Sequence, residues 1–355
     1  MTGIDGRAVA WPALIGLLAG AGTAGCRDDG ADPADGGTDV EATEADGRPD
    51  ADTLGDRADG VDGDVADAVE AEALDPDAPR VVLVIIDGAR YTETLGDPEA
   101  RFTPRMAELA GPACAPGPIL NLGPTVTMAG MSAIHTGAWY AWVQDPVTGD
   151  VWQGNPTHWE YYRKQLGRPV EDAVYVLEDF GGSIWLPSYD PDYGPAFWPT
   201  VVARGWSDDG VYDAFVDVVT GTAPPFLVVY LSDVDHEGHS GDWAAYTGAI
   251  ANADAIVGAI WELLEATPPY AGHTTMFVTS DHGRHDDAHG GFSSHGCDCP
   301  GCRQVTFLAL GPGIDPDCPA ADPPRTLIDL TPTIGRILGY VAEDSPGQVM
   351  TEIFR

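Results

Sequence analysis

Three aspartates of the sequence stand just after apolar runs that have the length of buried strands. Asp87 follows the run VVLVII, Asp235 comes shortly after FLVVYL, and Asp281 follows TMFVTS. In an open parallel sheet, ligands bind at the carboxyl ends of the strands, where such residues would meet. One aspartate in this position is equally well explained as a helix cap or a loop former, but three in one chain indicate a shared site.

Histidines close to these aspartates would complete a set of metal ligands. His239 follows Asp235 in the segment DHEGH, whose glycine we expect to let a loop curl, and His282 directly follows Asp281 on a predicted turn. His295 offers a further imidazole. Oxygen and imidazole ligands without clustered thiolates suit zinc or manganese better than calcium or an iron–sulfur cluster. Three aspartates and three histidines could hold two such divalent metal ions about 4 Å apart.

A hydroxyl group that such a centre could activate is found in the segment GPTVTMAGMSAIHTG, residues 123–137. Thr127 precedes small residues and a helical pattern, so it would lie at a helix N-terminus, where free backbone N–H groups stabilise a phosphate. The alternative is that Thr125 or Thr127 only caps the helix.

The elements that must position these residues are predicted from apolar patterning. Continuous apolar runs, as expected of strands buried on both faces, occupy residues 81–86, 173–177, 226–231, 275–279 and 305–310. Helical spacing of apolar residues is found at 104–110, after Thr127, and at 211–219, 242–265 and 330–338. Glycine- and proline-rich stretches at 140–155 and 187–199 predict long ordered loops. Alternating strands and helices predict the α/β class.

Five motifs recur in the order Asp87-Gly88, Thr127, Asp235-x-x-Gly-His239, Ser280-Asp281-His282-Gly283 and His295-Gly296. This order resembles the alkaline phosphatase superfamily, and it is most similar to the type I phosphodiesterase/nucleotide pyrophosphatase branch over nearly all of residues 80–355. The resemblance implies a three-layer α/β fold. In that fold a mostly parallel sheet carries helices on both faces, and the active site lies at the C-terminal ends of the strands.

The resemblance also implies roles for individual residues. One metal ion would be held by Asp235, His239 and His295, and the other by Asp87, Asp281 and His282, with the Thr127 Oγ as nucleophile. His289 competes with His295 for the last position, and we prefer His295 for its spacing to Gly311-Pro312. Asn155 is the preferred candidate for binding a phosphoryl oxygen, with Gln144 as the alternative.

Departures from the family pattern lie next to the nucleophile. Met128-Ala129-Gly130 stands where the phosphodiesterase branch has Phe-Pro-Asn, so the aromatic contact is missing. The sulfatase signature Cys-x-Pro-Ser-Arg is absent, and Thr127 stands where its cysteine would be. Threonine cannot become formylglycine.

The sequence therefore predicts a metal-dependent hydrolase of small-molecule phosphate esters, with phosphodiesterase activity as the preferred hypothesis. A phosphomonoesterase, a phosphoryl-headgroup transferase and a sulfatase-like hydrolase remain alternatives within enzymes. Outside enzymes, a metal-binding surface lipoprotein remains open.

Charge excludes one class of partner and divides the chain. The 355 residues include 56 acidic and 17 basic ones, for a net charge of −39, so duplex nucleic acid is not an expected partner. Residues 27–79 hold nineteen acidic residues and three arginines without aromatics, which predicts a disordered acidic linker. Residues 80–355 are the predicted catalytic domain.

Residues 1–26 are predicted to direct export rather than to form part of the fold. Arg7 precedes an apolar run that is too short to span a bilayer. The segment TAGC resembles a bacterial lipobox ending in Cys26, although leucine usually stands in place of Thr23. We expect an exported protein of the cell envelope, periplasmic or on the outer surface, touching the membrane only through a lipid anchor. An ordinary signal peptide with an incidental cysteine is the alternative.

The other five cysteines are an odd number for an oxidising compartment. Two disulfides and one free thiol are the simplest arrangement, and the sequence does not choose the pairing. For the segment CDCPGC, residues 297–302, a loop closed by a disulfide is favoured over a metal knuckle, because the second Cys or His pair of a closed zinc site is lacking.

Overall fold

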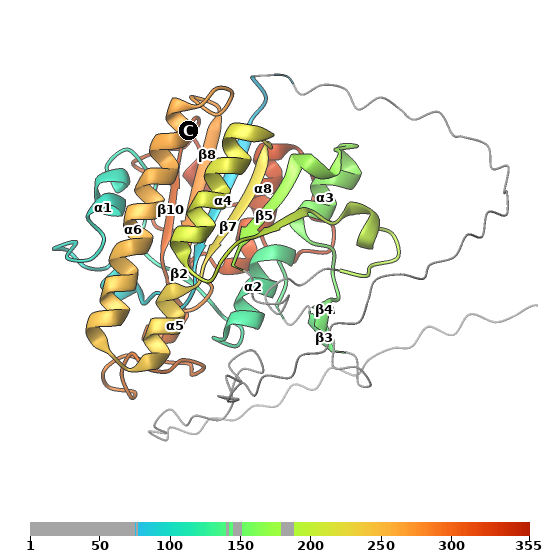
Figure 1. The fold of residues 1–355 in the computed structure, drawn as a ribbon. Helices are drawn as coiled ribbons and strands as arrows, with labels where there is room; N and C mark the ends of the chain where they lie inside the picture. Colours follow the sequence, from blue (N-terminus) through green and yellow to red (C-terminus); the bar gives the residue numbers. More distant parts are fainter. Residues whose placement is uncertain (1–74, 76, 140–141, 145–150, 179–187) are drawn as a thin grey trace, which may run out of the picture.

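A six-stranded sheet forms the centre of the protein (Figure 1). The computed structural model describes residues 75, 77–139, 142–144, 151–178 and 188–355, so the predicted signal segment, Cys26 and nearly all of the predicted linker lie outside the described residues. The strands, in spatial order, are β10 (Phe307–Leu310), β8 (Thr274–Thr279), β1 (Arg80–Ile86), β7 (Phe226–Leu231), β5 (Ala173–Leu177) and β6 (Thr200–Ala203). All neighbouring pairs are parallel except β10 with β8.

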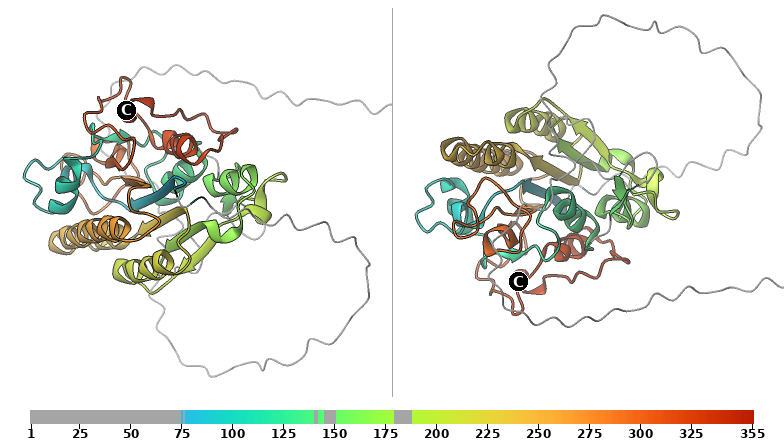
Figure 2. Two further views of the ribbon diagram at one scale, coloured as in Figure 1. Left: turned by 90° about the horizontal axis from the view of Figure 1, so that it is seen from above. Right: turned by 90° about the horizontal axis from the view of Figure 1, so that it is seen from below.

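Helices cover both faces of this sheet, which gives three layers (Figure 2). One face carries α1 (Pro104–Ala110), α4 (Asp208–Gly221) and α6 (Trp243–Ala266), and the other carries α2 (Thr127–Thr136), α3 (His158–Gln165) and α8 (Leu330–Leu338). The predicted α/β class and the mostly parallel three-layer arrangement are confirmed.

The apolar runs of β1, β5, β7, β8 and β10 exist because these strands are buried on both faces. In β1, Val81, Leu83 and Ile85 enter the core beneath α2, α3 and α8. The alternate residues Val82 and Val84, followed by Ile86, enter the core beneath α1, α4 and α6. Each such side chain contributes about 1.5–3 kcal/mol when it is fully buried, so a polar residue is excluded from either face of the strand.

Shorter elements complete the described fold. They are β2 (Ile119–Leu120), β9 (Gln304–Val305), β3 (Trp142–Gln144), β4 (Val151–Gln153), α5 (Asp233–Ser240), α7 (Pro300–Arg303) and the 3₁₀ helices η1 (Tyr91–Glu93), η2 (Val170–Asp172), η3 (Gly194–Phe197), η4 (Leu327–Asp329) and η5 (Thr351–Ile353). The predicted strand at residues 305–310 is in fact two: β9 pairs with β2 in a small separate sheet, and β10 joins the central sheet. No helix among the described residues is long and apolar enough to cross a membrane.

The segment after β7 forms a helix, whereas we expected a curled loop there. In α5 the acidic residues Asp233 and Asp235 occupy the first turn and His239 the last, which complements the helix dipole. Gly241 ends the helix in the left-handed conformation, with φ of 72°. These end effects outweigh the weak apolar pattern of the helix.

A disulfide joins two distant parts of the chain. Cys114 and Cys318 are bonded across 204 residues, and Cys114 also forms a β-bridge with Ala309 in β10. The bond therefore fixes the segment after α1 and the segment after β10 at the antiparallel edge of the sheet.

Replacing both Cys114 and Cys318 by serine is expected to lower the free energy of unfolding by about 2–5 kcal/mol, because the unfolded chain regains the freedom that a long closed loop removes. Urea denaturation of the wild type and the double variant measures this loss. Non-reducing peptide mass mapping of the wild type serves as the control and should recover the linked pair. A wild type without that linked peptide would contradict the assignment.

Candidate active site

The carboxyl ends of three neighbouring strands bring the predicted ligands together. Asp87 directly follows β1, Asp281 comes two residues after β8, and α5 begins two residues after β7. Because β8, β1 and β7 are adjacent and parallel, these residues meet at one edge of the sheet. Figure 1 shows α2 and α5 at the same end of the sheet, so Thr127, the first residue of α2, approaches from the other layer.

Thr127 lies against the first group of ligands. Its Oγ is 3.2 Å from the Nε2 of His282 and 3.4 and 3.5 Å from the two carboxylate oxygens of Asp87. The His282 Nε2 is 3.3 Å from Asp87 and 3.5 Å from Asp281. One ligand atom each from Asp87, Asp281 and His282 can therefore face a common point.

The second group of ligands adjoins the first. The His239 Nε2 is 3.1 Å from an Asp235 carboxylate oxygen and 3.0 Å from the Nε2 of His295. The His295 Nε2 is 3.7 Å from the other Asp235 oxygen. The rings of His282 and His295 stack with centroids 4.1 Å apart, so the two groups are continuous. The structure thus brings together all seven residues predicted as nucleophile or metal ligands.

The competing histidine, His289, lies elsewhere. Its Nδ1 is 2.5 Å from an Asp286 carboxylate oxygen, and its side chain is more than one-third exposed. Hydrogen bonds also orient the two buried histidines: His282 Nδ1 donates to the Gly283 carbonyl at 2.9 Å, and His295 Nδ1 donates to the Thr125 carbonyl at 3.0 Å. Both bonds leave the Nε2 lone pair directed at the carboxylates, as in metal-binding histidines.

Burial sets the charge state of this cluster. It raises the pKa of Asp87, with Asp281 and Asp235 adding repulsion, and it raises the pKa of Asp281 to about 7. Burial also lowers the pKa of His282 to about 4 and that of His295 to about 3, so both imidazoles are neutral at pH 7. Neutral imidazoles and clustered carboxylates are the form in which these groups bind a metal.

Asp235 differs from the other two aspartates because it has a buried cationic partner. Burial opposes its ionisation most strongly, but the Arg284 guanidinium and the nearby histidines outweigh this effect and hold the pKa of Asp235 below its usual range. Arg284 is fully buried and forms an ion pair with Asp235.

The ion pair is packed so closely that two glycines are required beside it. A Cβ atom on Gly238 would lie 2.5 Å from the Arg284 guanidinium carbon, and one on Gly88 would lie 2.4 Å from the Asp235 Oδ1. Gly88 also has a φ of +63°, which other residues rarely adopt. The Asp87-Gly88 and Asp235-x-x-Gly-His239 motifs therefore include their glycines for steric reasons.

Two buried side chains that position the ligands were not predicted from the sequence. The Tyr230 hydroxyl donates a hydrogen bond to Asp87 from β7, where the apolar run FLVVYL indicated only a core residue. The Asn121 amide donates to the Asp281 carbonyl at 2.9 Å. Neither could be found from spacing, because 143 and 160 residues separate the partners.

The described hydrogen bond of Asn155 is made with a residue outside the two groups of ligands. Its amide donates to the Asp344 carbonyl at 3.3 Å, and no contact that the structure describes joins it to Thr127 or to the metal-ligand groups. Its alternative, Gln144, ends β3. The phosphoryl-binding role of Asn155 stays a prediction.

The residues present fit a divalent metal centre. All donors are carboxylate oxygens or imidazole nitrogens, and the Asp281 Oδ2 is a buried acceptor without a hydrogen-bond partner in the described structure. A buried acceptor of this kind is costly unless a cation or a donor satisfies it.

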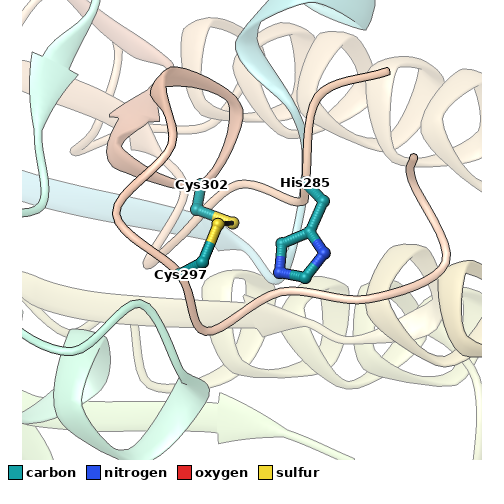
Figure 3. A group of neighbouring side chains, drawn as sticks. All are labelled: His285, Cys297 and Cys302. Atoms are coloured by element: carbon teal, nitrogen blue, oxygen red, sulfur yellow. Dashed lines mark hydrogen bonds between the residues drawn. The ribbon is translucent and has the colours of Figure 1, made fainter. Parts of the chain in front are cut away.

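The cysteine-rich loop does not close as predicted. Cys299 and Cys302 are free thiols, and the Sγ atoms of Cys297 and Cys302 are 3.8 Å apart, so residues 297–302 contain no disulfide within the loop. Figure 3 shows these two sulfur atoms side by side with the His285 imidazole next to them. His285 and Cys297 also have other contacts, and we do not assign a metal to this group.

A mostly parallel sheet with aspartates, histidines and a threonine at its carboxyl edge defines an alkaline phosphatase-like, metal-dependent hydrolase. A family model for type I phosphodiesterases / nucleotide pyrophosphatases matches residues 81–288. The chain belongs to this family.

Solved structures with the same fold come from several enzymes. Murine ectonucleotide pyrophosphatase/phosphodiesterase 5 is similar with a TM-score of 0.56 and 14% identity, over 78% of this chain and 100% of that one. A putative sulfatase from Bacteroides thetaiotaomicron is similar with a TM-score of 0.59 and 14% identity, over 77% of this chain and 73% of that one. The phosphonate monoester hydrolase of Silicibacter pomeroyi is similar with a TM-score of 0.56 and 15% identity, over 77% of this chain and 76% of that one.

One curated relative matches in sequence. It is a 2,3-bisphosphoglycerate-independent phosphoglycerate mutase of Natronomonas pharaonis, 32% identical over 142 residues, which are 39% of this chain. The match spans about a quarter (26%) of the length of that relative. The family match therefore identifies the family of the chain, and the solved structures show that it shares their fold.

Arg284→Ala is expected to destabilise the metal-free protein by about 3–5 kcal/mol, because it leaves Asp235 as a buried charge without its partner. Added zinc should recover part of this loss, since a bound cation restores the counter-charge. Urea denaturation with and without zinc measures both effects.

The matched control is Arg204→Ala, which removes an arginine from an ion pair with Asp217 in which the two side chains are 47% and 65% exposed. This variant should unfold almost as the wild type does, with or without zinc. If both variants lost the same free energy of unfolding, the role of Arg284 as the counter-charge of buried Asp235 would be refuted.

Proposed function

We propose that the protein is a phosphodiesterase with Thr127 as nucleophile and a centre of two divalent metal ions, zinc with manganese as the alternative. The observation that carries the proposal is the position of the Thr127 hydroxyl. It lies 3.2 Å from His282 and 3.4 Å from Asp87, at the N-terminus of a buried helix and beside the first group of ligands.

The residues divide into two sets of three ligands. Asp87, Asp281 and His282 would hold one ion, and Asp235, His239 and His295 the other. When bound, two such ions stabilise the developing negative charge on phosphate oxygens and lower the pKa of a coordinated hydroxyl. Asp87, whose acceptor oxygens face Thr127, is itself held by the Tyr230 hydroxyl.

The chain supplies orientation for an in-line displacement. The Thr127 oxygen forms a bond to phosphorus as the bond to the leaving alkoxide breaks, and the hydroxyl proton passes through solvent to the alkoxide, which leaves as an alcohol. The N-terminus of α2 presents the positive end of its dipole to the transferred phosphoryl group. Water then hydrolyses the phosphothreonine and restores the free hydroxyl.

A small-molecule phosphate diester is the substrate class that family membership supports. An inactive variant of murine ectonucleotide pyrophosphatase/phosphodiesterase 5, in which threonine is replaced by alanine, has been solved in complex with AMP. That protein therefore holds a nucleoside monophosphate in a fold like this one. For this chain we propose a phosphate ester as the substrate, and we do not propose that the substrate contains a nucleoside.

A second candidate function is phosphomonoester hydrolysis or phosphoryl transfer. The 32% identity with a phosphoglycerate mutase favours it, because that name describes a phosphomonoester substrate. Sulfate ester hydrolysis is less well supported, since Thr127 stands where sulfatases carry their modified cysteine. A metal-binding lipoprotein without activity is the alternative outside enzymes.

We also propose that the protein is exported and held at the cell envelope by a lipid on Cys26. The support is the sequence of residues 1–26 alone. Under this proposal, the acidic residues 27–79 would act as a tether between the anchor and the catalytic domain.

Thr127→Ala is expected to lower kcat on bis(p-nitrophenyl) phosphate by at least about 10³-fold, because the attacking oxygen is removed. Zinc content, measured by elemental analysis, should stay at the wild-type level, since six ligands remain. Thr127→Ser is the matched control and should retain measurable turnover because it keeps a hydroxyl. Undiminished activity in Thr127→Ala would refute the assignment.

Chelation followed by reconstitution separates the candidate functions. Chelator should abolish hydrolysis and zinc or manganese should restore it, with the highest rate on the diester among p-nitrophenyl diester, phosphate and sulfate substrates. A preference for p-nitrophenyl phosphate would favour the phosphomonoesterase. Full metal occupancy with no turnover on any of the three would favour the non-catalytic alternative.

A further inference from the structure

We propose that Glu178, Asp208 and Asp233 form a separate binding site for a hard divalent cation, namely Ca²⁺. Glu178 directly follows β5, Asp208 is the first residue of α4, and Asp233 is the first residue of α5. One carboxylate oxygen from each lies within 4.8 Å of the others. None of the three belongs to the two ligand groups around Thr127, so the proposal does not depend on the phosphodiesterase assignment.

Hydrogen bonds account for one oxygen of each carboxylate. Glu178 Oε1 accepts from the Ser232 hydroxyl at 2.5 Å. Asp208 Oδ1 accepts from the backbone N–H groups of Ser232 and Asp233 at 2.8 and 3.2 Å. Asp233 Oδ2 accepts from the backbone N–H of Asp208 at 3.0 Å. These bonds hold the start of α4 against the start of α5, and they leave the Oδ2 of Asp208 without a partner in the described structure.

The second oxygen of Asp208 is the observation that points to a ligand. Asp208 is completely buried, and its Oδ2 has no hydrogen-bond partner in the described structure. Among the described residues, no arginine or lysine forms an ion pair with Glu178, Asp208 or Asp233. A buried carboxylate is costly when one of its oxygens has no donor and the group has no counter-charge.

The directions of the pKa shifts of Asp208 and Glu178 agree with this geometry. Burial raises the pKa of Asp208, and repulsion from Asp233 and Glu178 adds to the effect. Burial likewise raises the pKa of Glu178, with His236 acting in the opposite direction. Three carboxylates in one pocket either share protons or hold a cation, and the experiment below distinguishes the two.

The donor set selects the cation. All three ligands are carboxylates, so hard cations are favoured over zinc. Mg²⁺ keeps several waters and uses one or two carboxylates, whereas Ca²⁺ takes six to eight oxygens in flexible geometry. Three carboxylates at the junction of three elements suit Ca²⁺.

Such an ion would fix the start of α5 to β5 and α4. Because α5 also carries Asp235 and His239, the ion would hold the helix that presents two ligands of the candidate active site. Its role is positioning, without contact to substrate.

The test measures Ca²⁺ binding to the full chain after zinc has filled the candidate active site. Isothermal titration should show one saturable Ca²⁺ site in the wild type, above the weak binding of the acidic linker that all variants share. Thermal melting should show a rise in Tm of about 5 °C when Ca²⁺ exceeds its Kd about 100-fold. Mg²⁺ at the same concentration should give a smaller rise.

Asp208→Asn is expected to weaken the saturable Ca²⁺ site at least about 10-fold and to remove the rise in Tm. In calcium-free buffer the variant should melt no lower than the wild type, because the substitution relieves repulsion among buried acids. The matched control is Asp213→Asn, which makes the same change at an exposed position of α4 and should retain the full response. If Asp208→Asn does not fold, Glu178→Gln replaces it with the same expected outcome.

A wild type without a saturable site would overturn the proposal and would indicate that the three carboxylates share protons instead. An equal rise in Tm in the wild type, Asp208→Asn and Asp213→Asn would also overturn it, since the bound Ca²⁺ would then lie elsewhere. Phosphodiesterase activity does not enter these readouts, so failure here leaves the function of Thr127 untouched.

Discussion

The burial of carboxylates side by side is the constraint on which the site depends. Asp87, Asp235 and Asp281 are each at most 7% exposed, and a buried carboxylate without compensation is protonated rather than ionised. Only Asp235 has a buried arginine next to it. The raised pKa values of Asp87 and Asp281 therefore describe a site that becomes fully ionised when a cation is bound, and metal affinity at this edge of the sheet must fall as the pH is lowered.

The same crowding explains the small residues around the site. A Cβ atom on Gly130 would lie 2.5 Å from the carbonyl oxygen of Asp281, so α2 packs directly on the backbone that presents a ligand. A larger residue at this position would move α2, and with it Thr127, away from the ligands. Gly130 therefore has a steric reason in how closely α2 approaches Asp281.

The fold could be predicted from the sequence where burial imposes a pattern. Strands β5 and β7 have the predicted bounds because both faces of each strand are covered. The helix α5 was not predicted, since its stability comes from charges at its ends and from packing on α6 rather than from apolar spacing. In the site, ligands within a motif could be found from spacing. Tyr230 and Asn121 could not, because each acts through a contact between segments that are far apart in the sequence.

The two acidic clusters are mechanically connected through α5. Asp233 lies in the first turn of this helix, Asp235 lies in the same turn, and His239 lies one turn later. A hydrogen bond or a cation that fixes Asp233 also limits the movement of Asp235, because both belong to one helical turn. The ion pair with Arg284 restrains the same helix through Asp235. A helix restrained at both of these aspartates would lose little further freedom if Asp235 and His239 bound a metal, and such preorganisation strengthens binding without any additional ligand.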